Sequence, residues 1–297
     1  MSEEKELTRG EQLRRALVYE RKNGWDRLDA EEGAALEAYC TGYKQFLDAG
    51  KTERECVDRA IAQAEAAGFR AYVRGMELKP GDRIYQVNRD KAIMLAVMGQ
   101  KGLEHGVNIG AAHIDSPRLD LKQNPLYESD ELGFFKTHYY GGIRKYQWVT
   151  IPLELHGVVA LKNGEVVRVS VGNGPDDPMF TIDDLLPHLA TDQVKKPLGE
   201  AIPAESLNIL VGSRPLRDDE GSDRVKLSVL ELLNRKYGIV EEDFLSAELC
   251  AVPAFRAVDI GFDRSLIGAY GHDDRVCAYA SLAALLQLGT PERTAVC

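Results

Sequence analysis

Hydrophobic positions in the first eighty residues recur at the spacing of amphipathic helices. Between positions 36 and 47, apolar side chains follow one another at intervals of three and four residues, and Gly50 comes soon after them. This pattern predicts a helix that buries one face and ends at the glycine. Thr52 and Glu55 then form a capping box ahead of a second apolar stripe, from Val57 to Ala64. We expect both helices to be scaffold without a chemical role.

Patterns typical of strands follow the helices. Residues 83–87 and 92–98 are predicted strands, and Asn88–Asp90 between them fits a tight hairpin connection. The apolar run Val107–His113 predicts a third, buried strand. Helices and strands therefore mix in this part of the chain, as in an α/β domain.

The middle of the chain, from about residue 120 to 253, has a different pattern. Short β-rich pieces at 149–155, 157–161 and 166–171 are separated by turn residues, and one helix is predicted at 225–237. This change predicts a separate β-rich domain inserted into an α/β domain.

The mixed pattern returns near the end of the chain. Arg275–Leu288 is rich in alanine and leucine and predicts a helix, and Thr294–Cys297 has the pattern of a strand's first residues. We therefore predict an α/β domain formed by residues 1–119 and continued by 254–297, with residues 120–253 as the inserted domain.

Composition narrows the class of protein. The chain has 297 residues, 44% hydrophobic and 28% charged, which are ordinary values for a water-soluble globular protein. A net charge of −10 argues against nucleic acid as the main partner, because phosphate binding needs a basic face. No run approaches the roughly 18–20 apolar residues of a membrane span.

Two further features indicate the compartment. The start, Met1–Glu6, is charged and lacks the apolar core of a signal peptide. Cysteine is odd in number and has no metal-like spacing. We therefore expect a reduced, cytoplasmic protein. The five cysteines are Cys40, Cys56, Cys250, Cys277 and Cys297.

Candidate chemistry begins at His113 and Asp115. Residues two apart on a strand point to the same side, so this imidazole and this carboxylate can both be directed at a single site. A neutral imidazole can bind a metal while a nearby carboxylate orients it. The alternative is a satisfied core histidine.

A second acidic cluster, Asp273–Asp274, stands at the start of the predicted last helix. The glycine-containing stretch before it, 268–271, allows close approach of the backbone. These aspartates suit a metallohydrolase, although helix capping is the alternative. Among the other histidines, His156 is expected to be exposed on a surface strand, and His138 to pack.

The motifs in this order resemble those of the aspartyl aminopeptidase family, the dinuclear-zinc exopeptidases of the aminopeptidase I type. The first metal motif, the glycine-rich segment, the proline-histidine-leucine-alanine segment and the second metal motif each have a counterpart. These are Gly110–Leu119, Tyr140–Gly142, Pro187–Ala190 and Tyr270–Ala278.

The resemblance implies roles for individual residues. His113 would bind one zinc, with Asp115 as the catalytic-site residue that orients it, and Asp274 would bridge both zinc ions. Asp273 stands where the family often has leucine and would be a neighbour of the ligands. Arg275 stands where the family usually has asparagine, which indicates a divergent branch.

Other family positions have no counterpart here. The family has a histidine after the proline-histidine-leucine-alanine segment that reaches a neighbouring subunit, where this chain has Asp192, and His188 is expected to be structural. The family's glutamate pair and two later ligands are absent, because the chain ends 23 residues after Asp274. Two zinc ions need roughly four ligands each, so the catalytic domain is expected to be incomplete.

The resemblance therefore implies an α/β fold, with an incomplete mixed-sheet zinc-exopeptidase domain and an inserted β-rich dimerisation domain. It implies an aminopeptidase that removes an N-terminal Asp or Glu, or a neutral residue, from peptides with a water activated by two Zn²⁺ ions. It also implies a homo-oligomer, typically a dodecamer. The alternative is a catalytically incomplete remnant that acts only as an oligomerising or structural protein.

Overall fold

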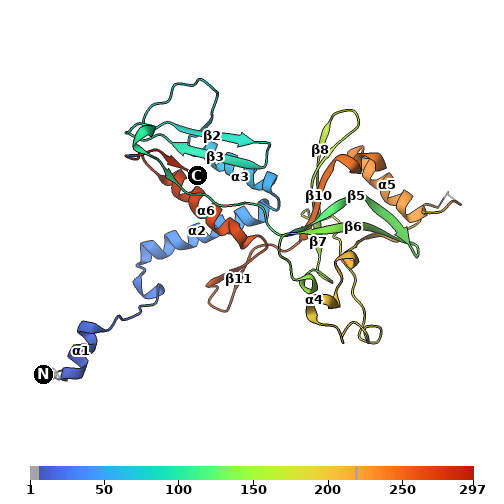
Figure 1. The fold of residues 1–297 in the computed structure, drawn as a ribbon, viewed down its shortest axis with the longest axis horizontal. Coiled ribbons are helices and arrows are strands. Elements are labelled where there is room, and N and C mark those ends of the chain that lie inside the picture. Colours follow the sequence, from blue (N-terminus) through green and yellow to red (C-terminus); the bar gives the residue numbers. More distant parts are fainter. Residues whose placement is uncertain (1–6, 218–219) are drawn as a thin grey trace. The chain divides into compact units, whose positions relative to one another are not determined.

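The computed structural model describes residues 7–217 and 220–297 of the chain (Figure 1). Met1–Glu6, the charged segment that lacks the apolar core of a signal peptide, lies outside the described residues. The chain divides into two units, Met1–Gly42 and Tyr43–Cys297. Within the described residues, no helix is long and apolar enough to cross a bilayer.

The smaller unit is helical. Helix α1 (Arg9–Leu17) begins at Thr8, whose side chain and that of Glu11 form a capping box. A 3₁₀ turn, η1 (Trp25–Arg27), precedes α2 (Ala30–Ala49), which continues into the larger unit.

Local signals in the larger unit produce the predicted helices. Tyr43, Phe46 and Leu47 at the end of α2 are buried, in agreement with the apolar stripe. Helix α3 (Glu53–Ala66) begins at Thr52, and the predicted capping box with Glu55 is confirmed.

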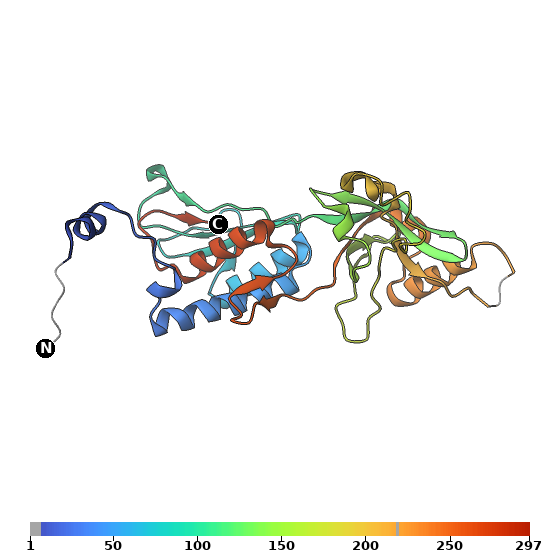
Figure 2. The same cartoon turned by 90° about the horizontal axis from the view of Figure 1, so that it is seen from below.

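A five-stranded mixed sheet, sheet A, lies against α3 and α6 (His272–Gln287). Leu95, Tyr279 and Leu282 are among the side chains that fill the core between them. Figure 2 shows α6, in red, alongside the strands of this sheet. Two pairings, β1 with β2 and β13 with β4, are parallel, and the other two are antiparallel. In sheet order, the strands are β1 (Arg70–Ala71), β2 (Arg83–Asn88), β3 (Ala92–Val97), β13 (Ala295–Val296) and β4 (Asn108–Ile109).

The predicted buried strand Val107–His113 is wrong in its extent and in its burial, since Asn108 and Ile109 are exposed. Only Asn108 and Ile109 are paired as a strand, and the last ladder bond runs from Gly110 N to Val296 O. Within the described residues, 111–117 then run without regular structure. His113 consequently lies in a loop rather than in a strand.

A six-stranded antiparallel sheet, sheet B, forms the middle of the chain, with α5 (Arg224–Tyr237) packed on β6 and β5. Leu119, Leu153 and Ile209 are among the fully buried side chains of its core. In sheet order, the strands are β8 (Val166–Val171), β7 (Leu153–Ala160), β10 (Ala247–Pro253), β5 (Arg118–Ser129), β6 (Leu132–Tyr140) and β9 (Ile209–Gly212).

Two details of sheet B differ from the expected short pieces. β7 is continuous through Gly157, which has a φ of 143°, so the expected break between 149–155 and 157–161 is wrong. β5 and β6 form a long hairpin, and Asp130 and Glu131 at its tip both have positive φ, as a tight hairpin turn requires.

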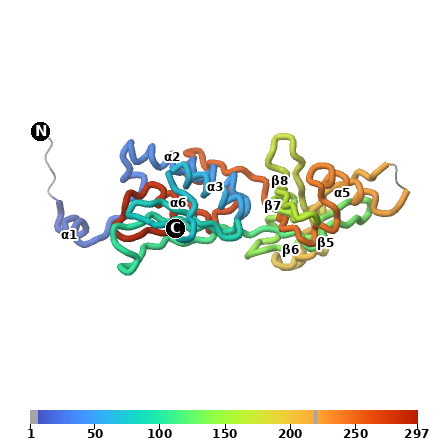
Figure 3. The backbone as a smooth tube through the Cα atoms, turned by 90° about the horizontal axis from the view of Figure 1, so that it is seen from above, coloured from blue at the N-terminus to red at the C-terminus, as the bar shows by residue number. Residues whose placement is uncertain are grey.

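The remaining elements are short. In chain order, sheet B begins after β4 and ends with β10, and a small hairpin of two strands follows before α6. Figure 3 shows the chain passing through β5–β8 and α5 before it reaches α6. The fold class is thus mixed α/β, as predicted, while the boundaries at 119 and 253 stay predictions. The short elements are β11 (Val258–Ile260), β12 (Leu266–Gly268), α4 (Leu198–Ala201), η2 (Leu103–His105), η3 (Lys145–Gln147), η4 (Ala204–Ser206) and η5 (Glu241–Ser246).

Candidate metal centre

The ring of His113 is half-exposed, and one of its two nitrogens is already engaged. Nδ1 lies 3.0 Å from the backbone oxygen of Asp115 and 3.2 Å from Oδ1 of the same residue. A carbonyl oxygen only accepts hydrogen bonds, so Nδ1 carries the proton in the neutral ring. Nε2 is left with its lone pair, which is the form that binds a metal.

A carboxylate from the far end of the chain faces that lone pair. Asp273, in the first turn of α6, has Oδ1 3.3 Å from Nε2 of His113, and its side chain is 84% exposed. An imidazole nitrogen and a carboxylate oxygen open to solvent are a suitable pair of ligands for a divalent transition metal.

The neighbouring Asp274 is placed differently. Its carboxylate interacts with the Cys277 side chain and raises the pKa of that thiol. Asp273, rather than Asp274, is therefore the aspartate in ion-pair contact with His113. The sequence could not distinguish them, because both stand at the start of the same helix.

Two hydrogen bonds connect the loop that holds His113 with the start of α6, which holds Asp273. The hydroxyl of Ser116 donates to the backbone oxygen of Asp273 at 2.8 Å. Arg275, which is 1% exposed, donates from Nε to the backbone oxygen of Ile114 at 2.9 Å. The loop after β4 and the start of α6 are thus held together directly.

The charges around this pair favour a positive group between them. Desolvation acts to lower the pKa of His113, but the Asp115 carbonyl and the charges of Asp115, Asp274 and Asp273 outweigh it, so the pKa is raised. Desolvation likewise opposes ionisation of Asp115, yet the hydrogen bond from Tyr140 and the nearby His113 lower the pKa of that carboxyl. The nearby carboxylates therefore favour the protonated form of His113.

The ligand set fits part of a zinc shell. His113 and Asp273 supply one nitrogen and one oxygen, whereas zinc takes about four ligands. In residues 7–217 and 220–297, no group of three or more His, Cys, Asp or Glu side chains is placed to hold a metal ion.

A cavity of about 670 Å³ adjoins this pair, and Asp273 is part of its wall. Trp148 and Phe255 give it apolar lining, and Arg144 and Arg256 contribute positive charge. A cavity of this size has room for a small ligand.

The other histidines considered from sequence lie elsewhere. His188 is exposed, and Asp192 is exposed and pairs with Lys195 at 3.2 Å. The expectation that His156 is exposed is wrong, because the side chain is 1% exposed. It is buried under Glu55 of α3, which the strand pattern alone could not reveal.

The sequence of this chain matches a described protein family over residues 46–295, namely "Aminopeptidase I zinc metalloprotease (M18)". The chain belongs to the aminopeptidase I (M18) family. The probable M18 family aminopeptidase 1 of Clostridium acetobutylicum is 48% identical over 284 residues, which are 94% of this chain and 61% of that protein. This chain therefore spans about three fifths of the length of that M18 relative.

Solved structures of the M18 family agree with the fold. The M18 aminopeptidase of Thermotoga maritima has a TM-score of 0.87 and 44% identity, covering 94% of this chain and 60% of that one. The mApe1 dodecamer of S. cerevisiae is more distant, with a TM-score of 0.66 and 17% identity over 88% of this chain and 60% of that one, and shows the fold alone.

Proposed function

We propose that this protein acts as a zinc aminopeptidase that removes the N-terminal residue from peptides. The observation that carries the proposal is the facing pair of His113 Nε2 and Asp273 Oδ1, 3.3 Å apart, in a chain of the aminopeptidase I family. The scattered cysteines favour a reducing compartment, and we propose the cytoplasm.

We propose that His113 and an aspartate of the pair 273–274 hold zinc, with Asp115 orienting His113. The resemblance pointed to Asp274, whereas the contact with His113 supports Asp273. Two zinc ions per complete site are proposed from the resemblance. Bound zinc lowers the pKa of a water molecule and polarises the carbonyl that the water attacks.

The residues of this chain also bear on substrate choice. Arg144 and Arg256 line the cavity beside Asp273 and would attract a negatively charged side chain at the peptide end. This charge supports a preference for N-terminal Asp or Glu, with neutral residues as weaker substrates.

We further propose a homo-oligomer formed through sheet B, up to a dodecamer like that of the yeast protein. An apolar cavity of about 700 Å³ on sheet B supports such a contact, because Phe135, Phe180 and Leu233 line it together with exposed Met179 and Leu232.

The second candidate is a non-catalytic protein that keeps sheet B for assembly and only part of the metal site. The observation that favours it is the lack of a three-donor group in the described residues.

Zinc binding to the metal-free chain, measured by isothermal titration calorimetry, distinguishes the zinc aminopeptidase from the non-catalytic protein. We expect wild type to bind zinc and His113→Ala to lose that binding, while His105→Ala, an exposed histidine of η2, binds like wild type. Release of aspartate from an Asp-initiated peptide, followed by mass spectrometry, then tests turnover. Absence of both zinc binding and turnover would support the non-catalytic protein instead.

A further inference from the structure

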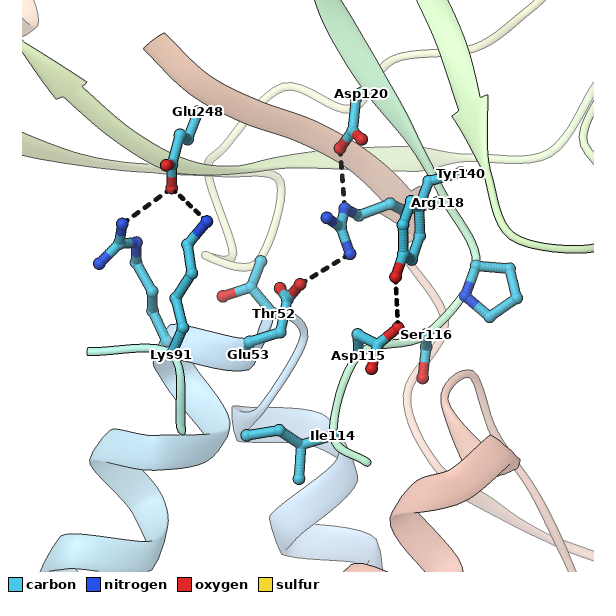
Figure 4. A network of polar contacts seen from close by, with 12 residues as sticks. Thr52, Glu53, Lys91, Ile114, Asp115, Ser116, Arg118, Asp120, Tyr140 and Glu248 are labelled. Carbon is cyan, nitrogen blue, oxygen red and sulfur yellow. Dashed lines mark hydrogen bonds and ion pairs between the residues drawn. The ribbon is translucent and has the colours of Figure 1, made fainter. Parts of the chain in front are cut away.

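Tyr140, the last residue of β6, reaches the metal motif with its hydroxyl. The hydroxyl donates to Asp115 Oδ2 at 2.7 Å (Figure 4). The other oxygen, Oδ1, lies 3.2 Å from Nδ1 of His113. The carboxylate is therefore held between a phenol from sheet B and the imidazole of the candidate metal ligand.

The ring of Tyr140 is itself fixed by Arg118. The two residues are direct cross-strand partners in the β5–β6 hairpin, and the guanidinium lies 4.2 Å from the ring centroid. A cation over an aromatic face is attracted to it.

Arg118 has little freedom to move away. Its Nε donates to Asp120 at 2.7 Å and its Nη1 donates to Glu53 of α3 at 2.9 Å, as Figure 4 shows. Its side chain is 16% exposed, so both ion pairs are partly shielded from water. Because Arg118 is itself held by two ion pairs, the ring of Tyr140 that lies against it has a fixed orientation, and so has the hydroxyl of Tyr140.

The neighbouring tyrosine provides a comparison within the same strand. Tyr139 directly precedes Tyr140 in β6, and its ring stacks on that of His138, with ring centroids 5.7 Å apart. It has the same chemistry and comparable exposure, 37% against 41%, but the hydroxyl that donates to Asp115 is that of Tyr140.

We propose that Tyr140 is a positioning residue for the metal site. By holding Asp115, it keeps the imidazole of His113 turned so that Nε2 faces the metal position. The inference rests on the proposed function, since it assumes that His113 binds zinc. It assigns to the β5–β6 hairpin a role in organising the site besides its part in sheet B.

Zinc affinity of the variants Tyr140→Phe and Tyr139→Phe tests the proposal. Tyr140→Phe keeps the ring under Arg118 and removes only the hydroxyl. We expect its dissociation constant for zinc to rise about tenfold, the usual effect of losing a group behind a metal ligand. Tyr139→Phe should bind zinc like wild type, and both metal-free variants should keep the wild-type melting temperature. Equal zinc affinity of Tyr140→Phe and wild type would overturn the proposal.

Failure of the proposed function gives a different result. If wild type binds no zinc, crystal structures of metal-free wild type and Tyr140→Phe decide the matter. We then expect Asp115 Oδ1 to stay near His113 Nδ1 in wild type and to turn away in the variant. An unchanged carboxylate in Tyr140→Phe would refute the positioning role independently of zinc.

Discussion

The guanidinium of Arg275 donates from Nε to the backbone oxygen of Ile114, 2.9 Å away, and so joins the two motif segments. The same side chain donates to the backbone oxygens of Gly50 and Lys51 at 2.5 and 3.1 Å. One buried cation therefore satisfies three backbone acceptors from two loops.

Replacing Arg275 with an uncharged residue should strongly destabilise the folded protein. We expect Arg275→Met to lower the free energy of unfolding by about 3 kcal/mol or more, because buried carbonyl oxygens lose their donors. Arg235→Met removes an exposed ion pair with Glu231 and should change the free energy of unfolding by less than about 0.5 kcal/mol. Urea denaturation of the metal-free proteins measures both. Similar losses in the two variants would contradict the role of Arg275.

The two adjacent aspartates should differ in zinc binding. Because Asp273 faces His113, Asp273→Asn should weaken zinc binding about 100-fold or more, beyond the effect of changing groups behind a ligand. Asp274→Asn, whose carboxylate faces Cys277, should bind zinc within a few-fold of wild type. Calorimetric titration of both variants makes the comparison. The reverse order would restore Asp274 as the ligand.

A buried histidine should make stability depend on pH. Burial acts to lower the pKa of His156, but Glu154 and Glu55 outweigh it and raise the pKa from 6.5 to about 9. Glu55 Oε1 lies 2.7 Å from Nδ1, and Lys51 also faces Glu154 at 3.3 Å. A raised pKa stabilises the folded state fully below pH 6.5, and this stabilisation is lost as the pH rises through about 9.

This histidine should thus contribute up to about 3 kcal/mol that disappears between about pH 6.5 and 9. Urea midpoints measured across this range should fall for wild type. His156→Gln should show a flatter profile, because glutamine carries no proton to lose. Parallel profiles for the two proteins would show that other groups cause the pH dependence.

A glycine inside β7 should resist substitution. A Cβ at Gly157 would overlap the backbone oxygen of Glu248 on β10, and its φ of 143° is unfavourable for other residues. We expect Gly157→Ala to destabilise the protein by at least about 2 kcal/mol. Gly199→Ala in α4 meets no atom within 4 Å and should be near neutral. Thermal denaturation of both variants provides the check, and equal melting temperatures would contradict the steric argument.

Features decided by neighbours in sequence were predictable. The capping box of Thr52 and Glu55, the end of α2 near Gly50 and the pairing of β2 with β3 all depend on residues a few positions apart. Such interactions form within a short stretch of chain, so a pattern of side chains suffices to indicate them.

Features decided by distant neighbours were not predictable. The long strands β5 and β6 were not among the β-rich pieces predicted, and His156 was expected to be exposed. Alternation along β7 gives the side of the strand on which His156 stands. It does not reveal that Glu55, 101 residues away, covers that side.

The sequence by itself determined the order of the motifs, the family resemblance and His113 as a candidate ligand. Only the tertiary structure decided which carboxylate meets His113 and which hydroxyl supports Asp115. Asp273 and Asp274 share one helix start, and Tyr140 is a strand residue like its neighbour Tyr139. Their different surroundings arise from packing between segments far apart in the chain, where hydrogen bonds such as that of Ser116 to Asp273 fix orientation.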